Sequence, residues 1–96
     1  MVELTLSKLM FGMPVSIDAH TTGWQRTYPL YDENGDCRIF LMIENEMDSV
    51  HVWARTPWDK FTIDTDVPKT EELSDKIDVV LKWFGYRIDW ELYRKD

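Results

Sequence analysis

Three residues of this chain could form a Cys-His nucleophile pair or act as soft or borderline metal ligands, namely Cys37, His20 and His51. A Cys-His pair could carry acyl transfer if Asp18 oriented the His20 imidazole, and the same three ligands could hold zinc with a carboxylate as the fourth. No CxxC or HxxxH spacing, no GxSxG sequence and no glycine-rich phosphate loop accompanies them. The pattern therefore favours structural roles, and we expect no catalytic residue, no metal site and no cofactor.

The acidic segment 32–36, Asp-Glu-Asn-Gly-Asp, has the composition of a calcium-binding loop. An EF-hand loop requires glycine at its sixth position and glutamate at its twelfth, whereas the glycine here is fourth. Asn34 and Gly35 both accept the positive φ angles of a type I′ turn, and apolar-rich segments lie on both sides. We therefore interpret the segment as the turn of a β-hairpin.

Alternating patterns predict the strands of a sheet around this turn. The hairpin strands are expected at 25–31 and 37–43, a third strand at 50–55, a short fourth at 60–64 and an N-terminal strand at 2–7. The second hairpin strand is apolar on both faces at 40–43, which is typical of a central strand covered on both sides. Residues 9–23 are the least informative, with an extended pattern at 14–17 and the composition of a loop at 18–23.

The C-terminal third predicts one amphipathic helix at about 69–84. Its apolar stripe has spacings of three and four and consists of Leu73, Ile77, Val80, Leu81, Phe84 and Ile88. Pro68 suits the first turn, Thr70 the N-cap and Gly85 a left-handed stop. Beyond Gly85 the period changes to two, so 86–93 is expected as a strand that rejoins the sheet, with a continuous helix as the alternative.

These elements predict an α+β fold in a single domain over 1–96. An antiparallel sheet, built as a meander of four to five strands plus a C-terminal strand, would pack against the helix. A length of 96 residues with 44% hydrophobic residues suffices for one core. One cysteine excludes an intramolecular disulfide, and neither a leader peptide nor an 18-residue apolar run is recognisable. We therefore expect a cytoplasmic protein, in the host cytoplasm if a phage encodes it.

The charge balance is the feature that bears most directly on partners. Eighteen acidic residues oppose eleven basic ones, and the formal net charge is −7. Nucleic acids and anionic membranes are bound through Lys and Arg, so direct binding to either is not expected. A basic protein surface is the partner that this charge suits.

The acidic residues concentrate in two predicted elements, the helix and the hairpin. The outward row of the helix holds Glu71, Asp75 and Asp78, the hairpin turn holds Asp32, Glu33 and Asp36, and the opposite end of the hairpin holds Glu44, Glu46 and Asp48. Arg38 is the only base from 32 to 48. An ordinary solvated surface is the alternative interpretation of both groups.

Five tryptophans are more than so small a core buries easily. Trp90 shares the apolar face of the last predicted strand and is assigned to the core. Trp53 points away from the apolar face of its strand, and Trp83 lies at the flank of the helical stripe. Trp24 and Trp58 are expected in loops. These last four are candidates for contact with a partner, because tryptophan is enriched among binding hot spots.

The function that these features favour is a small acidic protein-binding module. We expect an inhibitor that covers the basic, nucleic-acid-binding surface of a nuclease or another DNA-acting protein, in the manner of phage anti-restriction and anti-CRISPR proteins or of bacterial immunity proteins. One alternative is a small-molecule or nucleotide-binding sheet domain, in which Trp24, Trp53 or Trp58 stacks on a ring and Arg26 or Arg55 pairs with an anion. A homodimer or other homo-oligomeric subunit is a further alternative, and an enzyme is the least favoured class.

Overall fold

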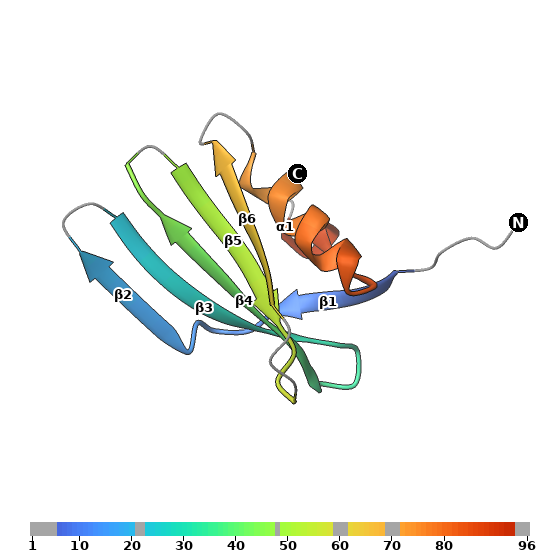
Figure 1. The fold of residues 1–96 in the computed structure, drawn as a ribbon. Coiled ribbons are helices and arrows are strands. Elements are labelled where there is room, and N and C mark those ends of the chain that lie inside the picture. Colours follow the sequence, from blue (N-terminus) through green and yellow to red (C-terminus); the bar gives the residue numbers. More distant parts are fainter. Residues whose placement is uncertain (1–5, 21–22, 48, 59–61, 69–71, 94–96) are drawn as a thin grey trace, which may run out of the picture.

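The computed structural model describes residues 6–20, 23–47, 49–58, 62–68 and 72–93, with the backbone alone for His20 and 62–68. Its elements are β1 (Ser7–Phe11), β2 (Ser16–His20), β3 (Gly23–Tyr31), β4 (Cys37–Asn45), β5 (Ser49–Arg55), β6 (Thr62–Pro68), α1 (Leu73–Trp83), β7 (Tyr86–Ile88) and the short 3-10 helix η1 (Trp90–Tyr93). A curled sheet with one α-helix against it confirms the predicted α+β class (Figure 1).

The strands form one sheet in the order β6-β5-β4-β3-β1-β7, and β2 pairs with β3 on the same edge as β1. β4 lies at the centre, as its apolar pattern predicts, with β3 and β5 antiparallel on either side. β6 is antiparallel to β5 and runs further along the chain than the expected 60–64. β7 is parallel to β1, so the sheet is mixed rather than fully antiparallel.

The edge of the sheet beside β3 is built in two pieces. β1 pairs with the end of β3 and β2 with its beginning. Between them, the backbone N–H groups of Gly12 and Val15 donate to carbonyls of β3 at 2.8 and 2.9 Å. Glycine fits closely at position 12, because a Cβ there would meet the Tyr31 ring and could be accommodated only if that ring moved. The chain thus follows β3 along most of its length.

Two expectations for this N-terminal part need correction. The loop expected at 18–23 is wrong at 18–20, which belong to β2, and at Gly23, which begins β3, because β2 and the beginning of β3 pair with each other through their backbones. The strand expected at 2–7 falls outside the described residues except for its last two positions, and Ser7 begins β1.

The turn between β3 and β4 is not of type I′. The Gly35 N–H donates to the Asp32 carbonyl at 3.0 Å, so Glu33 and Asn34 occupy the centre of the turn. Gly35 has a φ of 82°, and no described residue other than glycine has a positive φ, although type I′ requires one at Asn34. The Asp32 carboxylate accounts for the difference, because it accepts the backbone N–H groups of Asn34 and Asp36.

Helix α1 packs an apolar stripe against β5, β6 and β7. Its buried residues are Ile77, Val80 and Leu81. The helix begins at Leu73, later than expected, because Pro68 ends β6 on the edge of the sheet, where proline is tolerated. The expected cap Thr70 falls outside the described residues. Gly85, with a φ of 89°, ends the helix as predicted.

The region 86–93 is part strand and part helix. β7 ends at Ile88 and η1 follows, so the strand expected as far as 93 is wrong beyond 88, and so is the continuous helix. The Asp89 N–H still donates to the Leu9 carbonyl, after which Trp90 hydrogen-bonds to α1. A tertiary hydrogen bond thus overrides the alternating pattern.

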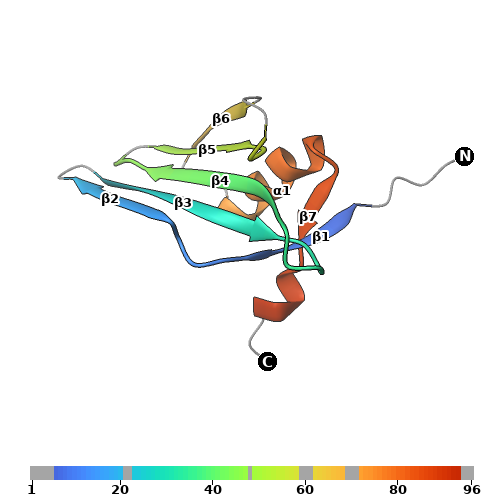
Figure 2. The same ribbon diagram turned by 90° about the horizontal axis from the view of Figure 1, so that it is seen from below.

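The two faces of the sheet differ in what lies over them (Figure 2). α1 lies on one face, which we call the covered face, and Trp90 of η1 packs against the same core. The core consists of Leu9, Leu30, Ile39, Leu41, Ile43, Val52, Ala54, Ile77, Val80, Leu81 and Ile88. Alternate residues of β4 and β5, among them Phe40, Met42 and Trp53, lie on the opposite face. No described helix lies over that face, and we call it the open face.

Candidate functional site

The residues expected to bind a partner fall into five separate regions. Asp75, Asp78 and Trp83 lie on α1; Asp32, Glu33 and Asp36 lie in the β3–β4 turn; and Trp24, Trp53 and Trp58 lie on the covered face, on the open face and beyond β5. Glu71 falls outside the described residues. The sequence therefore identified the residue types but not a single surface.

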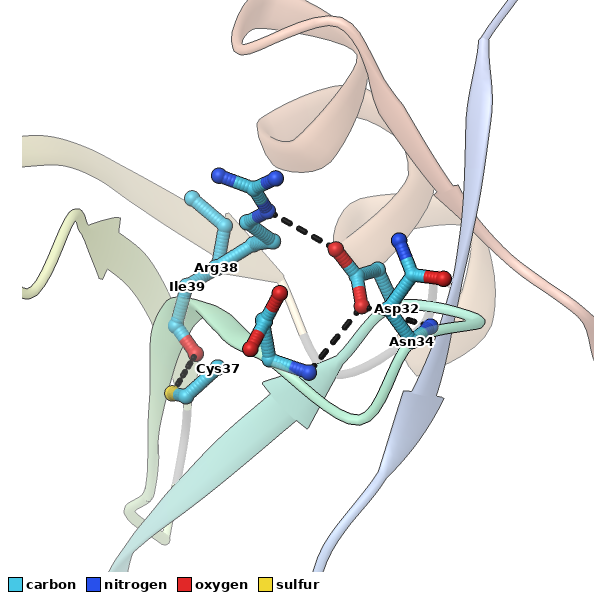
Figure 3. Close-up of polar contacts among 6 residues, drawn as sticks. Asp32, Asn34, Cys37, Arg38 and Ile39 are labelled. Carbon is cyan, nitrogen blue, oxygen red and sulfur yellow. Dashed lines mark hydrogen bonds and ion pairs between the residues drawn. The ribbon is translucent and has the colours of Figure 1, made fainter.

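The acidic turn is engaged in its own hydrogen bonds (Figure 3). The Asp32 carboxylate accepts Arg38 Nε at 2.9 Å and the backbone N–H groups of Asn34 and Asp36. The hydrogen bonds from Arg38 and from the Asp36 backbone hold the pKa of Asp32 below its usual value. Asp32 is therefore a structural carboxylate, and Glu33 and Asp36 are the exposed acids of the turn.

Bases from other strands also lie beside this turn. A cavity of about 550 Å³ is lined by Lys8, Arg38 and Arg87 together with Asp32 and Glu33. The sequence offered Arg38 alone as a neighbouring base, but β1 and β7 place Lys8 opposite Arg87. The turn thus lies among positive charges, which makes it a poor acidic surface for a basic partner.

Helix α1 exposes an apolar pair next to one of its predicted acids. Asp75 is exposed as expected, whereas Asp78 accepts the Trp90 Nε1–H at 2.8 Å and fixes η1 against the helix. Val79 and Trp83, one turn apart, are 60% and 64% exposed. The outward row of the helix is therefore less acidic and more apolar than the sequence indicated.

The open face joins apolar and acidic residues from five strands. Trp53 pairs with Met42, and the Arg55 guanidinium lies 4.8 Å from the centre of the Phe40 ring. One row across the sheet reads Ser16, Thr27, Met42, Trp53 and Asp64, and the next reads Asp18, Gln25, Glu44, His51 and Asp66. Residues paired across strands lie next to each other, so the register gathers acidic positions around one tryptophan.

The orientation of Trp53 agrees with the sequence analysis, but the acids near it were missed. Val52 and Ala54 on either side of Trp53 are fully buried on the covered face, as the alternation predicts. Asp18 and Asp66 lie almost fifty residues apart in the chain. Only the strand register, which cannot be read from local patterns, brings them into one row.

The two tryptophans expected in loops differ from each other. Trp58 lies beyond the end of β5, is 62% exposed and has the Arg38 guanidinium 6.0 Å from its ring centre. Trp24 belongs to β3, packs half-buried against the core and has the Arg26 guanidinium 4.5 Å from its ring centre. The loop prediction is wrong for Trp24, because the pairing of β2 extends the sheet to Gly23.

Trp24 and Arg26 line a pocket on the covered face between β3 and the beginning of α1. This Arg26 pocket has a volume of about 460 Å³ and is lined by Phe11, Trp24, Tyr28 and Trp90 around Arg26, together with residues of the first turns of α1. Arg26 is the only charged residue among the described residues that line it. Its Nη1 donates to the Tyr28 hydroxyl at 3.3 Å, whereas its buried Nε has no described hydrogen-bond partner.

The candidate nucleophile and metal ligands are spread over three strands. Cys37 begins β4 and its thiol donates to the Ile39 carbonyl at 3.6 Å, His51 pairs with Glu44 across β5 and β4, and His20 lies in β2. In the described ranges, no group of three His, Cys, Asp or Glu side chains is placed to hold a metal ion. The described residues therefore supply no assembled site for the Cys-His chemistry considered above.

No protein-family model matches this chain, and comparisons with curated proteins and with solved structures give no match either. Within the part of the chain that the structure describes, no helix is long and apolar enough to cross a membrane. Function must therefore be inferred from the surfaces and the pocket themselves.

Proposed function

We propose that this protein is an acidic protein-binding module that covers the basic, nucleic-acid-binding surface of a partner protein, with the open face as its contact surface. The observation that carries the proposal is the register of the open face, which sets Trp53 and Met42 beside the row containing Asp18 and Glu44. An aromatic centre next to carboxylates is the combination that a surface rich in Arg and apolar contacts would recognise.

Charge supports the same partner. The two rows of the open face hold the carboxylates of Asp18 and Glu44, and Arg55 in the neighbouring row is a base close to them. With a net charge of −7 the whole molecule attracts a basic protein over a distance and repels nucleic acid. The carboxylates would take the places that phosphates occupy in the partner's nucleic-acid complex.

A module of this kind suits the role of a phage anti-restriction or anti-CRISPR protein, or of a bacterial immunity protein, that blocks a DNA-acting enzyme in the cytoplasm. In this role the protein carries out no chemistry of its own. Binding requires only that the open face is presented to the partner, and β4, paired on both sides, lies at the centre of that face.

The test is a capture experiment with matched charge reversals. Wild type, the double variant Asp18→Lys/Glu44→Lys and the helix variant Asp75→Lys are immobilised and exposed to bacterial lysate. We expect a basic DNA-binding protein to be retained by wild type and by Asp75→Lys, but not by the double variant. The retained protein should elute as salt rises to about 0.5 M, where charges are screened within a few ångströms.

The captured partner is then assayed for duplex DNA binding with increasing amounts of soluble wild-type protein. We expect DNA to be displaced at one equivalent and no displacement by the double variant. Equal retention by the double variant, retention that salt does not weaken, or a partner that keeps its DNA would each contradict the proposal. If wild type sediments as a dimer and captures nothing, the exposed pair Val79 and Trp83 on α1 favours a homodimer instead.

A further inference from the structure

We propose that the Arg26 pocket binds a small planar aromatic anion, with the ring among the aromatic side chains and a carboxylate or phosphate on the Arg26 guanidinium. This site lies on the covered face and does not depend on the protein-binding function of the open face. Three features carry the proposal: the hydrogen-bonding state of Arg26, the way in which the rings are held, and the size and charge of the pocket.

Arg26 has more donors than the described protein groups accept. A guanidinium carries five N–H donors, and here Nη1 donates to Tyr28 while the buried Nε has no described partner. The guanidinium lies over the Trp24 ring at 4.5 Å, which stabilises its charge but accepts no hydrogen bond. A partly desolvated cation without a carboxylate is costly, and an anionic oxygen in the pocket would satisfy it.

The aromatic residues around Arg26 are held in place by contacts of their own. The Phe11 ring lies 5.5 Å from that of Tyr28 and 5.9 Å from that of Trp90. Asp78 fixes Trp90 through its indole N–H, and the Phe11 backbone N–H donates to the Tyr93 hydroxyl at 2.9 Å. A ligand would therefore enter a pocket that is already formed, which lowers the entropic cost of binding.

Size and charge restrict the ligand to a small anion. A volume of about 460 Å³ is typical of a site for one small molecule. Leu73 and Ser74 of α1 line the pocket, and the N–H groups of a helix's first turn add partial positive charge where the N-cap residue Glu72 makes no side-chain cap hydrogen bond. The net charge of −7 elsewhere opposes a polyanion.

The experiment uses two pairs of probes that differ only in their anionic group: indole-3-acetate with indole-3-acetamide, and adenosine monophosphate with adenosine. Binding is followed by titration calorimetry and by the indole N–H resonances of Trp24 and Trp90. We expect at least one anion to bind about tenfold or more tightly than its neutral counterpart, because a hydrogen bond to a charged group has that effect. The pair that shows the preference identifies carboxylate or phosphate as the natural group.

Two variants and a control locate the binding site. Arg26→Met should abolish the preference for the anion, and Leu73→Glu at the partly exposed edge should weaken anion binding by about tenfold through repulsion. Arg55→Met removes an arginine that lies over Phe40 on the open face and should bind as wild type does. Circular dichroism establishes that each variant is folded. If Arg26→Met does not fold, the anion affinity of Leu73→Glu tests the position of the binding site instead.

Several results would overturn the proposal. No binding of any probe at millimolar concentration, equal affinity for the charged and neutral members of both pairs, or unchanged anion binding by Leu73→Glu would each do so. If Arg55→Met lost the preference for the anion as fully as Arg26→Met, the anion would bind on the open face instead. None of these results would affect the protein-binding proposal, which is tested by charge reversal at Asp18 and Glu44.

Discussion

The covered and open faces are made from the same strands, yet they are buried in different ways. On β4, Ile39 and Leu41 are fully buried beneath α1, whereas Met42 faces away from the helix and is only 7% exposed. Met42 lies between Thr27 and Trp53 in its row, and the large Trp53 side chain beside it accounts for much of its burial. A central strand can therefore be apolar on both faces with a helix on only one of them.

Polar groups divide between the faces in an equally uneven way. Among the residues that the structure describes, the covered face holds one guanidinium, that of Arg26, whose buried Nε has no described partner. The open face holds the carboxylates of Asp18 and Glu44, with Arg55 over Phe40 and with Arg38, two residues before Phe40 on β4, donating to Asp32. One protein thus offers an aromatic cation site on one face and an aromatic acidic surface on the other, which suits two different classes of ligand.

The largest difference between the faces should appear in stability. Leu41→Ala removes a fully buried side chain beneath α1 and should lower the free energy of unfolding by about 2–5 kcal/mol. Phe40→Ala, on the half-buried open face, should cost only about 1 kcal/mol. Urea unfolding followed by circular dichroism measures both values.

Equal losses for the two variants would mean that the open face is as deeply covered in solution as the core. A second copy of the chain is the simplest cover, and it would make the Phe40→Ala loss depend on protein concentration. A loss that does not change on dilution would show that the sheet alone buries Phe40 more fully than the structure indicates.

Replacing a tryptophan on each face should also give unequal losses in the free energy of unfolding, with a smaller difference than that between Leu41→Ala and Phe40→Ala. Trp90→Phe deletes the donor to Asp78 and leaves a half-buried carboxylate, so the free energy of unfolding should fall by about 1–3 kcal/mol. Trp53→Phe on the open face deletes no described hydrogen bond and should cost a few tenths of a kcal/mol. Asp78→Ala, which removes the acceptor, combined with each variant in a double-mutant cycle should show coupling to Trp90 alone, and coupling to Trp53 would contradict this arrangement.

The fold could be predicted where local patterns carry the information. The apolar run of β4 indicated a central strand, and the spacing in 73–84 indicated α1 with Gly85 as its end. The 18–20 segment of β2 could not be predicted, because its pairing to β3 and not its composition makes it a strand. η1 was mistaken for a strand because Trp90 and Leu92 keep the alternation that the Asp78 hydrogen bond interrupts.

The candidate sites were less predictable than the fold. A helical wheel places Asp78 toward solvent, since it cannot include η1 folding back onto α1. Asp32 looked like a free acid because its bond to Arg38 depends on the conformation of the turn. The sequence predicts only in general terms that a tryptophan and Arg26 share a binding site, and the pocket also needs Phe11 and Trp90 from opposite ends of the chain.

The smallest expected effect is on the pH dependence of the free energy of unfolding. It compares the two arginines that lie over tryptophans, Arg38 with a carboxylate partner and Arg26 without one. Arg38 donates to Asp32, whose pKa in the folded protein lies below the ordinary value of 3.8. The pair therefore contributes stability above about pH 4, and this contribution is lost as the pH falls through the lowered pKa, because the unfolded chain binds the proton first. Asp32→Asn keeps the acceptor for the backbone N–H groups and removes the titration.

The free-energy gap between wild type and Asp32→Asn should therefore narrow as the pH falls from about 5 to about 2, a modest change because the ion pair is at the surface. Urea unfolding at each pH measures this difference in the free energy of unfolding. The titration of the other carboxylates affects both proteins alike and largely cancels in the difference. Arg26→Met should keep the wild-type pH dependence, since no described carboxylate accepts a hydrogen bond from Arg26. Parallel curves for wild type and Asp32→Asn would show that Arg38 is no better paired than Arg26, and an altered slope in Arg26→Met would reveal a carboxylate partner and remove the argument for an external anion.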